Sequence, residues 1–134
     1  MYDIMDYKNI DCLFERSNQQ LLVNRKQRNL LVRSEATKAY KFLYNMLLEN
    51  KVIDYDSLNS NSEYIKFFSS DTYYKLLEDS ISEWVLLNTV YKLNSKINCE
   101  LCDYPILRVY TLVNVKNTNV LRVGKSCGSV FKVL

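Results

Sequence analysis

Three cysteines in the C-terminal part of the chain are the residues whose types and spacing best suit binding of a metal ion. Cys99 and Cys102 form a Cys-x-x-Cys pair, and Cys127 follows after twenty-four intervening residues, shortly after Gly124. Two thiolates at Cys-x-x-Cys spacing can occupy one edge of a zinc tetrahedron. A hairpin after Cys102 would return the chain so that the sulfur of Cys127 lies near the first two. Gly124 allows a tight bend before Cys127. The spacing therefore predicts a zinc site with Cys99, Cys102 and Cys127 as ligands.

The fourth ligand of such a site is left open by the sequence. The chain has no His, and no Cys follows Cys127. The alternatives are Cys12, Glu100, Asp103 and a water, and a water would leave the open coordination position of a catalytic zinc. Cysteine-rich sites without His are usually structural, and the commonest general base is absent from the chain. We therefore expect a structural ion and no enzymatic activity.

Two other interpretations of the Cys-x-x-Cys pair also stay open. The pair could be a metal-free remnant of a zinc knuckle, or a set of free or redox-active thiols. The redox interpretation fits less well, because the pair precedes a predicted hairpin instead of opening a helix in a thioredoxin-like unit. A glycine-rich phosphate loop is excluded, since Gly124 and Gly128 are the only glycines.

Basic residues are spread unevenly along the chain. The net charge is +3, but residues 8–42 have eight basic and three acidic groups, residues 43–84 have three and eight, and residues 85–134 have seven and two. Two basic segments around an acidic one could form a phosphate-binding face, and a surface solvated by charges of both signs is the competing interpretation. The residues expected to contact nucleic acid are Arg25, Lys26, Arg28, Arg33, Lys116, Arg122 and Lys125.

The elements that position these residues are expected to be helical in the first two thirds of the chain. Residues 18–31 fit either a helix or short strands. Ser34 is a good N-cap for a helix that ends at Asn50, because apolar residues recur at helical spacing between them. A further helix is predicted from about Asp71 through Ile81.

Strands are expected from about residue 83 onward. Residues 83–91 are rich in aromatic and β-branched side chains, and residues 106–113 alternate between two faces. Residues 114–119 have turn composition, and residues 120–123 supply a return strand.

These elements predict the fold class and the organisation of the chain. The class is α+β, with a mainly helical region over residues 1–82 and a β-rich, zinc-knuckle-like module over residues 83–134. The two regions are either separate units or one compact domain, since 134 residues suffice for one domain.

Composition and the chain start indicate the compartment. Hydrophobic residues make up 48% and charged residues 25%, which excludes a disordered or low-complexity chain. The first residues lack the basic and apolar regions of a signal peptide, and no apolar run approaches the ~20 residues that span a bilayer. We therefore expect a cytoplasmic protein with no membrane partner and no small-molecule substrate.

The C-terminal part of the chain resembles a small zinc-finger-like module found in uncharacterised proteins of phages and mobile elements of low-GC Gram-positive bacteria. The resemblance covers residues 83–131 and rests on Cys99-x-x-Cys102, Val113-Asn114, Val123-Gly124-x-x-Cys127 and Phe131. It implies a zinc-supported β-hairpin with Cys99, Cys102 and Cys127 as ligands. Members commonly have Gly after the second Cys, where this chain has Asp103.

Three functions follow as hypotheses. The first is a non-catalytic accessory protein of a phage or mobile element that acts on nucleic acid beside a polymerase, primase or helicase. The second is a protein-binding inhibitor of a host defence effector, of the anti-CRISPR type, whose acidic segment 49–83 imitates nucleic acid. The third is a metal-dependent enzyme, which the absence of His and of a paired-carboxylate motif disfavours.

Overall fold

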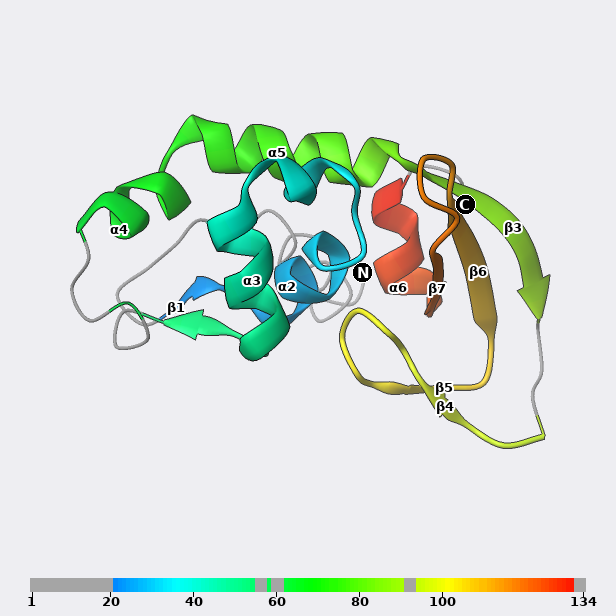
Figure 1. Ribbon diagram of the computed structural model, residues 1–134. Helices are drawn as coiled ribbons and strands as arrows, with labels where there is room; N and C mark the ends of the chain where they lie inside the picture. The colour runs from blue at the N-terminus through cyan, green and yellow to red at the C-terminus, as the bar shows by residue number, and fades with distance from the viewer. Residues whose placement is uncertain (1–20, 55–57, 59–61, 91–93, 132–134) are drawn as a thin grey trace, which may run out of the picture.

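Helices and small antiparallel sheets make up the protein, which confirms the α+β class (Figure 1). The helical part precedes most of the strands, as expected from the sequence. Within the described part of the chain, no helix is long and apolar enough to cross a membrane. The structure is a computed structural model that describes residues 21–54, 58, 62–90 and 94–131.

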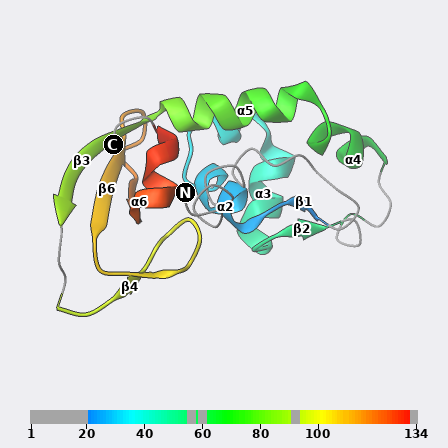
Figure 2. The same ribbon diagram turned by 180° about the vertical axis from the view of Figure 1, so that it is seen from behind.

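Residues 18–31 fit either a helix or short strands by sequence, and their described part, residues 21–31, contains one strand and one helix. Strand β1 (Leu21–Val23) pairs antiparallel with β2 (Ile53–Asp54), and helix α2 (Arg25–Leu31) follows β1 at once (Figure 2). Asn24 caps α2, because its side chain accepts from the Gln27 N–H at 2.9 Å while Gln27 accepts from the Asn24 N–H at 3.1 Å. This reciprocal capping box sets the start of the helix.

The single helix expected from Ser34 to Asn50 is wrong in its first half. The region holds a 3₁₀ turn, η2 (Ala36–Ala39), and then helix α3 (Lys41–Glu49). Tyr40 separates them with φ −118° and ψ 83°, outside the helical region. The Ser34 hydroxyl does not cap this helix, since it donates to a carbonyl in the last turn of α2. The end at Asn50 is confirmed.

Helix α5 (Asp71–Ser82) confirms the third predicted helix, while the preceding α4 (Ser62–Phe68) was not expected. In both views α5 runs along one side of the molecule beside α3 and α2 (Figures 1 and 2). Its apolar face covers a buried cluster that includes Phe68, Tyr73 and Leu77. Only Glu83 separates α5 from the first strand of the main sheet, so the long helix leads directly into the β-rich part.

The main sheet has the strand order β3-β6-β7 and is antiparallel throughout. It contains β3 (Trp84–Val90), β6 (Val109–Asn114) and β7 (Val120–Val123), in agreement with the expected strands and the turn between residues 114 and 119. The strand expected from residue 106 starts later, because β5 (Pro105–Ile106) pairs instead with β4 (Ile97–Asn98). This small hairpin carries the Cys-x-x-Cys pair in its loop.

The chain ends, within the described residues, in α6 (Lys125–Gly128) and the 3₁₀ turn η4 (Ser129–Phe131). Phe131 meets Trp84 edge-on, with ring centroids 6.4 Å apart. These rings belong to a second buried cluster, which packs beneath the sheet. Helix α2 contributes Leu30 to this cluster and Leu31 to the helical one, so the two cores meet along α2.

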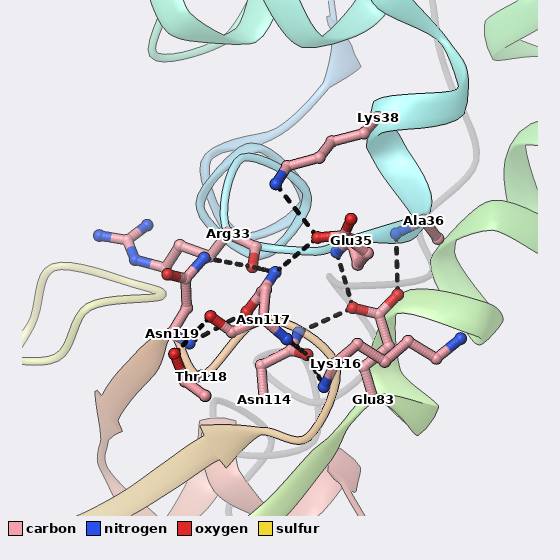
Figure 3. A network of polar contacts seen from close by, with 10 residues as sticks. All are labelled: Arg33, Glu35, Ala36, Lys38, Glu83, Asn114, Lys116, Asn117, Thr118 and Asn119. Atoms are coloured by element: carbon pink, nitrogen blue, oxygen red, sulfur yellow. Dashed lines mark hydrogen bonds and ion pairs between the residues drawn. The ribbon is translucent and has the colours of Figure 1, made fainter.

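A buried carboxylate ties the helical part to the sheet (Figure 3). Glu83 is 1% exposed, and its Oε1 accepts from the Glu35 N–H and from Asn114 Nδ2, each at 2.7 Å. Its Oε2 accepts from the Ala36 N–H at 2.9 Å. These bonds join the end of α5, the start of η2 and the end of β6 at one point.

The turn between β6 and β7 docks on the same segment. Asn117 and Asn119 donate from their side-chain amides to the Arg33 carbonyl, at 3.2 and 3.0 Å (Figure 3). Asn117 also donates to the Glu35 carboxylate at 3.3 Å. The hairpin is therefore held against the end of α2, which fixes the position of the strand that leads to Cys127.

Candidate metal centre

Three sulfur atoms from two separate segments meet in one place. Cys99 and Cys102 lie in the loop between β4 and β5, and Cys127 lies in α6. Their Sγ atoms are all within 4.8 Å of one another, a spacing that can hold a metal ion. Cys99 is 1% exposed and Cys127 4%, whereas Cys102 is partly exposed. The structure thus brings together all three cysteines that the spacing singled out.

The backbone around Cys99 forms a tight knuckle. The Cys99 N–H donates to the Tyr104 carbonyl, and the Asp103 N–H donates to the Cys99 carbonyl, both at 2.8 Å. Asp103 has φ 65°, in the left-handed region that favours Gly. Asp is among the few other residues that adopt this conformation readily. Asp103 therefore keeps the turn that a Gly would provide.

Gly124 lets the second segment approach this knuckle closely. Its N–H donates to the sulfur of Cys99, where it helps to lower the pKa of that thiol. A Cβ at this position would stand 3.1 Å from Cγ2 of Ile106 in β5, closer than ordinary packing. A side chain at this position would require Ile106 to shift by a few tenths of an ångström.

The three thiols share one negative charge when they are free of metal. Hydrogen bonds from the Cys102 and Cys127 thiols lower the pKa of Cys99 to about 2. The same bonds, to Cys102 first and then to Cys99, raise the pKa of Cys127. The pKa of Cys102 also rises, because its bond with Cys127, which lowers it, is outweighed by the bond with Cys99 and by burial. Cys99 is thus the preformed thiolate of the cluster.

Lys26 lies near this centre and is only 7% exposed, unlike the other predicted basic residues. Its contact with nucleic acid stays a prediction. Its charge acts on Cys127 and lowers the pKa of that thiol. Three thiolates around a divalent ion would carry a net charge of −1, and the positive charge of Lys26 favours such a centre.

Neither carboxylate considered as a fourth ligand joins the cluster. Glu100 accepts from the Arg122 N–H through Oε1 at 2.6 Å, and the Asp103 carboxylate lies 4.0 Å from the guanidinium of Arg25. Cys12 lies outside the described residues. Among the described acidic and cysteine side chains, these three sulfurs form the group close enough together to hold a metal ion.

A basic cleft of about 310 Å³ adjoins the knuckle. It brings together three of the arginines predicted to contact nucleic acid, namely Arg25, Arg28 and Arg33, and it reaches Cys99. Lys51 also lines it, although sequence reasoning missed this residue because it lies in the acidic segment 43–84. The carboxylates of the cleft are Glu100 and Asp103.

The remaining basic residues of the prediction lie elsewhere. Lys116 is in the turn between β6 and β7, Arg122 is on β7, and Lys125 begins α6. All three are exposed, and none of them lines the cleft. The structure thus separates the predicted basic residues into a cleft group, a hairpin group and the buried Lys26.

Comparison of the chain with protein-family models, with curated proteins and with solved structures finds no match.

The ionisation of the cluster predicts how metal affinity depends on pH. Protons compete with the metal for sulfur, so affinity falls as pH falls. Cys99 is already a thiolate, whereas Cys102 and Cys127 must each lose a proton. We expect affinity to rise about 100-fold per pH unit between about pH 6 and pH 8, corresponding to two protons. Competition with a chromophoric chelator measures this slope, and a thousandfold rise per unit would mean that Cys99 is also protonated.

Proposed function

We propose that the protein is a non-catalytic, zinc-stabilised protein that binds nucleic acid as an accessory factor of a phage or mobile element. The observation that carries the proposal is the cluster of three cysteines beside a cleft lined by Arg25, Arg28, Arg33 and Lys51. In this proposal the ion is structural and stabilises the fold, and the cationic side chains of the cleft contact phosphates. The partner in the cell is a replication enzyme such as a polymerase, primase or helicase.

The donor set supports zinc as the metal. Three cysteine sulfurs suit a borderline-soft ion with tetrahedral geometry, whereas magnesium and calcium prefer oxygen ligands. Backbone N–H groups support the sulfurs, since those of Cys102 and Gly124 donate to Cys99 and that of Tyr104 donates to Cys102. A bound ion would fasten the loop between β4 and β5 to α6.

The position of the cysteine loop links the ion to the basic cleft. The Asn29 side chain donates to the Leu101 carbonyl at 2.8 Å, which joins α2 to the loop that carries Cys99 and Cys102. Arg25, Arg28 and Arg33 lie on or just after the same helix. An ordered loop therefore helps to hold the wall of the cleft in place. Clustered Arg and Lys gain affinity for nucleic acid by releasing counterions from phosphates.

Salt dependence of nucleic-acid binding tests this proposal. We expect fluorescence anisotropy to show binding of labelled single-stranded or double-stranded DNA that weakens between about 50 and about 200 mM salt. The double variant Arg25→Ala/Lys51→Ala should lower the slope of log affinity against log salt by about 1.4 to 1.8.

The matched control removes two charges away from the cleft. Lys66 in α4 and Lys75 in α5 are exposed, so Lys66→Ala/Lys75→Ala should leave the slope within about 0.3 of the unmodified protein. Absence of binding to either form of DNA at low salt would refute the proposal. An equal change of the salt slope in both double variants would show that the cleft does not contact the nucleic acid.

A protein-binding inhibitor of a host defence effector is the second candidate, and the edge of the sheet favours it. Strand β3 pairs only with β6 in the described sheet, and Val85, Leu86 and Leu87 are 41%, 36% and 58% exposed. Exposed apolar edge strands are sites for pairing with another chain. A pull-down from host lysate with the protein and with Leu87→Lys separates the candidates. Loss of a captured nuclease effector in the variant favours inhibition, and loss of a replication enzyme favours the first function.

A further inference from the structure

We infer that the basic cleft beside the cysteine knuckle binds a phosphate monoester group. This inference rests on the proposed function, because it names the part of a nucleic acid that the cleft would hold. A phosphate monoester occurs at the end of a nucleic-acid strand and in a free nucleotide, and the cleft would recognise the same group in both. The positions of the arginines, the charge of the cleft and the volume of the cleft support the inference.

Arg28 is held in a fixed orientation at the cleft. Its Nε donates to the carbonyls of Leu47 and Asn50, at 3.0 and 3.2 Å, and its Nη1 donates to Asn29 Oδ1 at 3.0 Å. None of these bonds uses Nη2. A guanidinium that is already ordered loses little entropy when it binds an anion, and its planar fork suits phosphate oxygens.

Arg28 and Arg33 are close enough to repel each other. Burial first, and the charge of Arg33 second, lower the pKa of Arg28. Arg33 donates from Nη1 to the Asn29 carbonyl at 2.8 Å, which keeps its guanidinium at the same end of α2. An anion bound between the two guanidinium groups would offset their repulsion, and this favours the bound state.

The charge of the cleft favours a strongly charged anion. Four cationic side chains line it, against two carboxylates and the Cys99 thiolate, so cationic groups are in excess. A phosphate monoester carries a charge of about −1.5 to −2 at neutral pH. A phosphodiester carries a single charge and would be attracted less strongly.

The volume limits what can enter with the phosphate. A cleft of about 310 Å³ lies at the small end of ligand sites, which span about 300 to 1,000 Å³. This space suits a phosphate and an attached sugar. The group therefore enters as a strand end or as a single nucleotide.

Three probes test the inference by fluorescence anisotropy and calorimetry. They are a 5′-phosphorylated single-stranded oligonucleotide, the same strand without the phosphate, and a nucleoside 5′-monophosphate. We expect the phosphorylated strand to bind about tenfold more tightly than the unphosphorylated one. Arg33→Ala and Lys51→Ala should each remove most of this difference, while the control Lys66→Ala should retain it. Circular dichroism establishes that each variant is folded.

The outcomes separate this inference from the proposed function. Equal binding of both strands, unchanged in the cleft variants, would overturn the inference and leave the nucleic-acid function standing. Binding of the monophosphate alone, lost in Arg33→Ala, would support the phosphate site and refute the nucleic-acid function. Absence of binding by all three probes at low salt would overturn both.

Discussion

The Glu83→Gln variant is expected to be less stable than the unmodified protein by about 2 to 4 kcal/mol. Three donors converge on the Glu83 carboxylate, two on Oε1 and one on Oε2. An amide has one oxygen, so its NH₂ group must face at least one of the buried N–H groups. The variant thus loses a charge-assisted bond and leaves a donor unpaired, and each of these costs stability.

Urea denaturation of the variant and a matched control measures this effect. Glu78 lies on α5 as well but is exposed, so Glu78→Gln makes the same chemical change where water can replace any lost bond. We expect the control to change the free energy of unfolding by less than about 0.5 kcal/mol. Equal stability of the two variants would show that the Glu83 carboxylate does not hold the two parts together.

Loss of the proposed zinc ion is expected to have the largest effect of all. Cys99, Leu101 and Cys127 belong to the buried cluster beneath the sheet, so an ion at the sulfurs would support the core itself. Zinc binding contributes about 10 to 16 kcal/mol to the folding of isolated zinc-finger peptides. We expect Cys127→Ser to reduce the stability of the metal-loaded protein by at least about 4 kcal/mol.

A chelator provides the internal control for this prediction. With the metal removed, the unmodified protein and Cys127→Ser should have free energies of unfolding within about 1 kcal/mol of each other, since the remaining difference is one buried thiol. A chelator that leaves the unmodified protein as stable as before would contradict the role given to the ion.

The meeting of the three cysteines could be predicted from the sequence because its determinants are local. The Cys-x-x-Cys spacing fits one turn, and the alternating residues of β6 and β7 indicate the hairpin that returns to Cys127. Helix α5 was also predictable, since its apolar residues recur at helical spacing. The binding of an ion, its identity and the fourth ligand stay predictions.

The errors come from contacts that the local pattern does not contain. A break at Tyr40 divides the helix expected from Ser34, and the N–H groups of Glu35 and Ala36 bond to Glu83, far along the chain. The burial of Lys26 near Cys127 is likewise not visible in the local sequence, because it depends on how α2 packs. Lys51 reaches the basic cleft from an acidic segment, because segment charge does not determine which side chains meet.

The metal content of the purified protein tests the central claim most directly. Elemental analysis of protein prepared without chelator should give one zinc per chain, and Cys99→Ser, Cys102→Ser and Cys127→Ser should each lower this value severalfold. The Cys12→Ser variant would lower it as well if Cys12 is the fourth ligand. A purified chain with no bound metal, which also takes up neither zinc nor cobalt on titration, would contradict the account.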